Sequence, residues 1–71
     1  MGEYRMRDNT TGHHYKIGQV VQNRWSDMLG LIVAQYYCEY AQEEMIKILA
    51  GNQVFYDYRY ENWTWKIISE P

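Results

Sequence analysis

The chain has few of the residues from which structural and catalytic sites are commonly built. Its single cysteine, Cys38, excludes an internal disulfide framework and a multi-cysteine zinc site. Seven Lys and Arg against nine Asp and Glu give a net charge of −2, which argues against binding nucleic acid through bulk positive charge. No apolar run approaches the ~18 residues needed to span a bilayer, and the N-terminal residues lack the apolar core of a signal peptide. We therefore expect a soluble, cytoplasmic domain without membrane contact.

Patterns that carry catalysis are missing as well. The sequence contains no glycine-rich phosphate loop, no cysteine pair and no Ser–His–acid arrangement. His13 and His14 are adjacent, so their side chains diverge, and we interpret them as exposed. Cys38 ends an apolar segment and is interpreted as a buried structural thiol, whereas Glu43 and Glu44 are interpreted as solvated. We expect no enzymatic activity, no metal site and no cofactor.

The length of 71 residues allows one small domain. Residues 1–15 show no periodic apolar pattern and include Asn9-Thr10-Thr11-Gly12, so they predict a flexible tail. Residues 16–71 alternate between short β-prone runs and turn signals, which predicts the folded domain.

Five segments of the folded part are predicted as strands: residues 17–21, 28–38, 45–49, 53–58 and 63–68. Gly18 is interpreted as a bulge or a close backbone approach, and Gly30 or residues 34–35 as a bend in the long second strand. Residues 39–50 are ambiguous, because their helix propensity also allows a helix that would give an α+β domain. The favoured fold is all-β, a small closed or half-closed barrel. The expected core is Ile17, Val21, Leu31, Val33, Ile46, Ile48, Val54 and Ile67.

The run YKIGQVVQN followed by LGLIV resembles the start of SH3-like small barrels. Tudor, KOW and hemimethylated-DNA-binding (YccV-like) domains begin in a similar way, and small phage-encoded SH3-like proteins look similar too. The resemblance implies a five-stranded SH3-like barrel in which the first turn and the turn before the last strand lie on the same side. The matching residues are Gly18, Val21, Leu29, Gly30, Leu31, Ile32 and Val33.

Aromatic residues are the most informative feature for function. Eight tyrosines, three tryptophans and one phenylalanine are too many to fit inside so small a barrel. Rings left outside either cover the barrel ends or form a recognition surface, where Tyr and Trp are enriched. The predicted partner-binding residues come from the two turns that the resemblance places together, with two arginines at the flanks: Arg24, Trp25, Tyr58, Arg59, Tyr60 and Trp63.

Two functions from different classes are consistent with this surface. The favoured one is a non-catalytic module that holds a protein partner, and the resemblance to phage proteins suggests a modulator of a host protein. The alternative is a barrel that binds RNA or DNA, with Arg24 and Arg59 on phosphates and the rings stacked on bases. Self-association through leftover aromatic surface is a third, weaker hypothesis.

Overall fold

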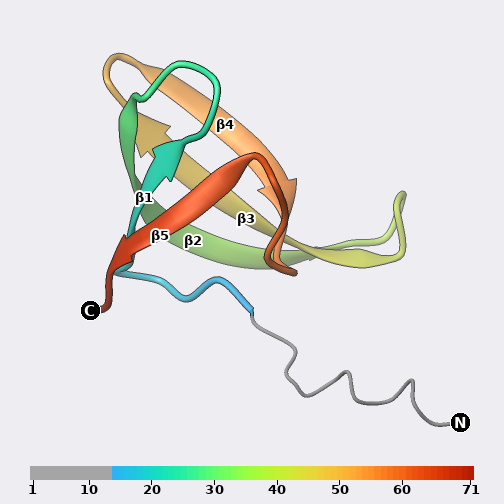
Figure 1. Ribbon diagram of the computed structural model, residues 1–71. Helices are drawn as coiled ribbons and strands as arrows, with labels where there is room; N and C mark the ends of the chain where they lie inside the picture. The colour runs from blue at the N-terminus through green and yellow to red at the C-terminus, as the bar shows by residue number, and fades with distance from the viewer. Residues whose placement is uncertain (1–13) are drawn as a thin grey trace, which may run out of the picture.

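A computed structural model describes residues 14–71 as a single antiparallel β-sheet (Figure 1). Its strands lie in the order β4-β3-β2-β1-β5, so the last strand pairs with the first. The prediction of an all-β, five-stranded fold is confirmed. The strands are β1 (Val20–Asn23), β2 (Leu29–Cys38), β3 (Glu43–Ala50), β4 (Gln53–Tyr58) and β5 (Trp65–Ser69).

The ambiguous segment 39–50 forms a turn followed by a strand, not a helix. Residues 39–42 connect β2 to β3, and β3 then pairs along its length with both β2 and β4. Gly51 and Asn52 close the β3–β4 hairpin, with Gly51 at a φ of 63° in the left-handed region that glycine adopts at no steric cost. Helix propensity is a weak local preference. The hydrogen bonds that β3 forms with strands on both sides therefore outweigh it.

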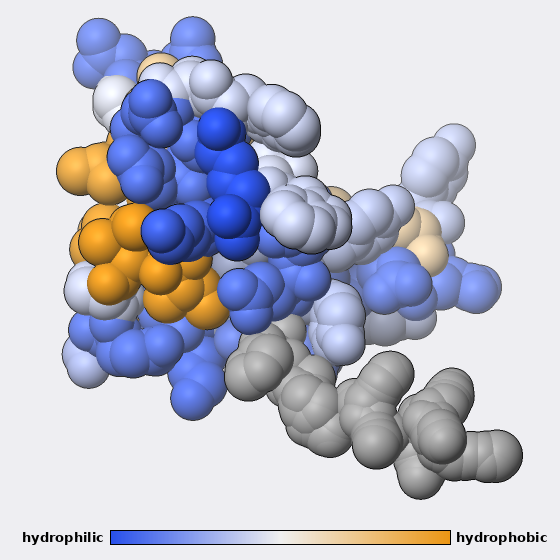
Figure 2. Space-filling view, in the orientation of Figure 1, coloured by the Kyte–Doolittle hydropathy of each residue, from blue (hydrophilic) through white to orange (hydrophobic). Residues whose placement is uncertain are grey.

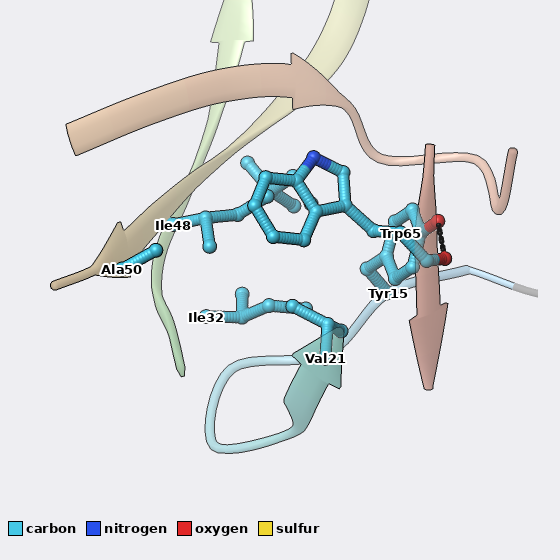
Figure 3. Close-up of a cluster of buried hydrophobic side chains, with 7 residues drawn as sticks. Tyr15, Val21, Ile32, Ile48, Ala50 and Trp65 are labelled. Atoms are coloured by element: carbon cyan, nitrogen blue, oxygen red, sulfur yellow. Dashed lines mark hydrogen bonds between the residues drawn. The ribbon is translucent and has the colours of Figure 1, made fainter. Parts of the chain in front are cut away.

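The sheet curls around the indole of Trp65, which lies at the centre of the core (Figure 3). Within residues 14–71, β4 and β5 do not pair with each other. The rings of Phe55 on β4 and Trp65 on β5 instead meet edge to face, with centroids 5.5 Å apart. Side-chain packing therefore connects the two edges of the sheet. The buried apolar residues are Tyr15, Val21, Ile32, Ile46, Ile48, Ala50 and Trp65.

The predicted core was only partly correct. Val21, Ile46 and Ile48 are buried as expected and Ile67 is partly buried. Ile17 lies in a turn before β1 and is exposed, so it was wrongly assigned. The other incorrect assignments, Leu31, Val33 and Val54, lie on the outer face of the sheet.

Strand β2 shows why the inward face was misjudged. Its run LGLIV is apolar at four of five positions, so no alternation marks which side faces the core. Ile32 pairs with the buried Ile48, which places Gly30 and Ile32 inside and Leu31 outside. Gly30 has no space for a side chain, because a Cβ there would lie 2.7 Å from the Ile48 Cγ2 atom. A register shift between Ile32 and Ala34 then bulges the strand at Val33, close to one of the two predicted bends.

Tyr15 belongs to the core, although composition placed it at the end of a tail. Its side chain is 0% exposed, and its backbone N–H donates to the Arg59 carbonyl at 2.8 Å. Its hydroxyl donates to the Trp65 carbonyl at 2.6 Å (Figure 3) and accepts from the Asn62 N–H at 3.1 Å. The folded domain therefore includes Tyr15 and the bridge from His14 to Tyr60. The rest of the predicted tail, residues 1–13, lies outside the described residues.

Gly18 makes the close approach predicted for it. Its φ is 98°, and a Cβ at this position would lie 2.8 Å from the Cβ of Pro71. The buried Gln19 side chain accepts from the Lys16 N–H and donates to the Glu70 carboxylate, both at 2.9 Å. The turn before β1 is thereby joined to the residues that follow β5.

Replacing Tyr15 with Phe removes the hydroxyl but keeps the ring. The buried Trp65 carbonyl and the partly buried Asn62 N–H then lose their partner, which costs about 1–3 kcal/mol of unfolding free energy. Urea denaturation of the wild-type and Tyr15→Phe proteins measures this difference. Equal midpoints and slopes would show that the hydroxyl does not stabilise the fold.

Stability is also expected to fall at alkaline pH because of Tyr15. Burial raises the pKa of its phenol above the usual tyrosine value of 10.0. The unfolded chain therefore ionises first, so this stabilisation is fully present below about pH 10 and is lost as the pH rises toward the folded-state pKa. Thermal melts from pH 8 to 11.5 should show a steeper loss for wild type than for Tyr15→Phe. Parallel curves would contradict this role.

Candidate binding surface around the β4–β5 loop

Residues 59–64 connect β4 to β5 and are held by a local hydrogen-bond network. The Asn62 Oδ1 atom accepts from the Thr64 N–H at 2.9 Å, an Asx turn that sets the loop geometry. The Tyr15 hydroxyl accepts from the Asn62 N–H, which anchors the loop to the core. The side chains on either side of Asn62 are consequently presented from a fixed backbone.

The turn between β1 and β2 lies beside this loop. The Asn23 Oδ1 atom accepts from the N–H groups of Trp25 and Ser26 at 2.9 and 3.0 Å, and Asp27 adopts a left-handed φ of 64°. The Arg24 N–H donates to the Thr64 carbonyl at 2.9 Å. This hydrogen bond joins the β1–β2 turn directly to the β4–β5 loop. The two turns therefore lie next to each other, as expected.

The first of three shallow clefts described here lies where these turns meet. The Arg24 guanidinium lies over the Trp63 ring, 5.3 Å from its centroid, in a cation–π contact. Trp63 remains 76% exposed and Trp25, next to Arg24, 80% exposed. The cleft has a volume of about 260 Å³ and is lined by Arg24, Tyr60, Glu61, Asn62 and Trp63.

The second cleft shares the same loop and opens toward β3 and the end of β4. It has a volume of about 330 Å³, and its walls combine two tyrosine rings with two carboxylates. Tyr58 and Tyr60 are each about half exposed, so part of each side chain is accessible to solvent. The lining residues are Glu43, Tyr58, Tyr60, Glu61 and Asn62.

Arg59 has an internal partner that the sequence did not reveal. Its Nη1 atom lies 2.6 Å from the Glu44 carboxylate, and its Nε–H donates to the Tyr15 carbonyl at 3.4 Å. The Arg59 N–H also donates to the Glu44 carbonyl, which extends the β3–β4 ladder past the end of β4. These contacts give Arg59 a structural role. It also lines a third recess of about 290 Å³ with His14, Glu43, Glu44 and Tyr60.

The predicted site residues thus lie around one loop but make different contributions. Arg24, Tyr60 and Trp63 share the first cleft, and Tyr58 and Tyr60 share the second. Trp25 projects from the neighbouring turn without lining either cleft. In Figure 2, strongly apolar residues gather on the left of the face in view, and residues of polar and intermediate hydropathy cover most of the rest. We call the set Arg24, Trp25, Tyr58, Tyr60 and Trp63 the loop surface.

Several residues of this region were not predicted as part of a site. Glu43 is exposed, as its interpretation as solvated implies, but it also lines the second cleft, and so does Glu61, for which no role was predicted. His14 was interpreted as an exposed tail residue; it is exposed, but its ring meets Tyr60 edge to face at 5.4 Å. Only Asn62 could have been recognised from the sequence. Asn is common in turns because its side-chain oxygen can accept a hydrogen bond from the backbone N–H two residues later.

Cys38 lines none of the three recesses described above. Cys38 is partly exposed at the end of β2, so the interpretation as a buried thiol was wrong. Among residues 14–71, no group of three or more His, Cys, Asp or Glu side chains is arranged to hold a metal ion. No helix of the described chain is long and apolar enough to cross a membrane.

No family model matches the chain, and no curated protein or solved structure is significantly similar to it. The resemblance to SH3-like barrel families therefore stays a prediction.

Replacing Asn62 with Ala should disturb the loop, because its Oδ1 atom is the acceptor that turns the backbone. The loss of this hydrogen bond is expected to cost about 0.5–1.5 kcal/mol. Asn62→Asp keeps an acceptor oxygen at this position and should retain most of the stability. Thermal unfolding of both variants tests the assignment, and an equal loss in the two would contradict an acceptor role.

Proposed function

We propose that the protein is a non-catalytic binding module that holds a protein partner on the loop surface. Following the resemblance to small phage-encoded barrels, we propose further that it acts in the cytoplasm and modulates a host protein. The observation that carries the proposal is the exposure of Trp63 and Trp25 on two turns that a hydrogen bond joins. Large rings on a fixed backbone lose little conformational entropy on binding, which is why Tyr and Trp are enriched at interfaces.

Core packing does not account for these rings. Trp65 and Tyr15 fill the interior with aliphatic side chains, whereas Trp25 and Trp63 keep more than three quarters of their surface in solvent. An exposed indole contributes little to the stability of a domain, so its removal should leave the fold intact. Binding to a partner would account for the exposure of both indole rings, which the folding of the domain does not require.

Charge favours a protein partner over nucleic acid. Of the two arginines expected to contact phosphates, Arg59 is paired with Glu44, which leaves Arg24 on the loop surface. Both clefts also contain Glu61, and the second adds Glu43. Carboxylates repel phosphates. Affinity for nucleic acid comes largely from Lys and Arg side chains that contact phosphates and release the counterions bound there.

Trp63→Ala is expected to abolish capture of the partner while the protein stays folded. The immobilised wild-type protein would be incubated with a nuclease-treated cell lysate, and retained proteins would be identified by mass spectrometry and re-tested in purified form. Tyr40→Ala is the matched control, because Tyr40 is fully exposed on the β2–β3 turn, outside both clefts. It should bind like wild type, and circular dichroism should show the same fold for all three proteins.

Two results would contradict the proposal. One is capture that Trp63→Ala and Tyr40→Ala retain equally, which would remove the loop surface from the interaction. The other is capture that disappears on nuclease treatment and declines steeply with salt, which would favour nucleic-acid binding.

A further inference from the structure

We propose that the second cleft binds an arginine side chain of the partner protein. The cleft is the one lined by Glu43, Tyr58, Tyr60, Glu61 and Asn62. This inference rests on the proposed function, because it specifies the chemistry of the partner at the same loop.

The walls of this cleft have two properties that together select an organic cation. The tyrosine faces carry the negative side of the ring quadrupole, which attracts a cation. The carboxylates of Glu43 and Glu61 add negative charge from β3 and from the loop. A metal ion is a poorer fit, since no metal-binding group of three such side chains occurs among residues 14–71.

Neighbouring contacts on the same side of the molecule already use both kinds of chemistry to hold arginine. The Arg24 guanidinium lies over the Trp63 ring, and the Arg59 guanidinium forms an ion pair with the Glu44 carboxylate. In contrast, no basic side chain lines the second cleft, and neither Glu43 nor Glu61 forms an ion pair within the described part of the chain. The second cleft therefore has the walls of an arginine site without an arginine from residues 14–71.

Arginine fits better than lysine for a physical reason. The planar guanidinium is weakly hydrated, stacks on aromatic faces and can donate hydrogen bonds to a carboxylate at the same time. An ammonium is compact and more strongly hydrated, so it gains less from contact with an aromatic ring. The described chain has seven acidic against five basic side chains, which adds a weak general attraction for a basic partner.

A matched peptide pair tests the proposal directly. The probe is acetyl-Gly-Arg-Gly-Arg-Gly-amide, and its partner has citrulline at both arginine positions, which keeps the shape and removes the charge. Each would be titrated into the ¹⁵N-labelled full chain and followed by backbone amide shifts. Because Arg5 and Arg7 of the chain could compete for the cleft, the titrations would be repeated with both changed to Gln.

The arginine peptide should shift the amides of Tyr58, Tyr60 and Glu61 in a saturable way, and the citrulline peptide should not. Glu43→Gln, Glu61→Gln and Tyr58→Leu should each weaken binding about two- to fivefold, the range for exposed cation–π and ion-pair contacts. Two controls make the same chemical changes on the β2–β3 turn: Glu39→Gln and Tyr40→Leu. Both should retain the wild-type affinity.

The proposal is overturned if the citrulline peptide binds equally well, if the shifts map elsewhere, or if Glu39→Gln weakens binding as much as Glu61→Gln. Its failure can be separated from failure of the proposed function. A protein partner whose capture needs Trp63 but survives Glu43→Gln and Glu61→Gln would leave the loop surface as a protein-binding site without an arginine cleft. Capture that is also insensitive to Trp63→Ala would remove both.

Discussion

The hydrogen bond from the Tyr15 hydroxyl to the Trp65 carbonyl joins the two segments on which the rest of the structure depends. One segment enters β1 and the other enters β5, the strand that pairs with it. Among residues 14–71, seven buried apolar side chains form the core, so two large rings account for much of its volume. The same hydroxyl accepts from the Asn62 N–H and thereby positions the β4–β5 loop. Core packing and the presentation of the loop surface thus share one anchor.

A small sheet with many rings must leave most of them outside, and their location gives the surface its chemistry. Trp65 occupies the centre, whereas Trp63, two residues earlier, lies in solvent against Arg24. The two arginines of residues 14–71 are also placed differently: Arg59 forms an ion pair with Glu44, and Arg24 lies over the Trp63 ring. Acidic side chains at the second cleft then make the loop surface better suited to a basic protein than to a phosphate backbone.

Strand existence was predictable because β-prone runs and turn residues are local signals. The β4 boundaries matched, and the Gly18 close approach was anticipated from glycine in a strand-like run. The inward face was not predictable for β2, since Leu31 and Ile32 are equally apolar. Its orientation follows from pairing Ile32 with Ile48, a contact sixteen residues away, and from the bulge at Val33. Tyr15 was missed because it precedes the first regular strand.

For the site, composition alone indicated that some Tyr and Trp side chains would lie on the surface. Their number exceeds what the core of a 71-residue chain can enclose. It also excluded disulfide and multi-cysteine zinc sites, which need residues the chain lacks. Only the tertiary structure decided which charges accompany the rings. Glu43 on β3 shares the second cleft with Tyr60 and Glu61, and Arg59, one residue past β4, forms an ion pair with Glu44 on β3. These pairings depend on register between distant segments, and register is set by packing over the whole sheet rather than by any local run of residues.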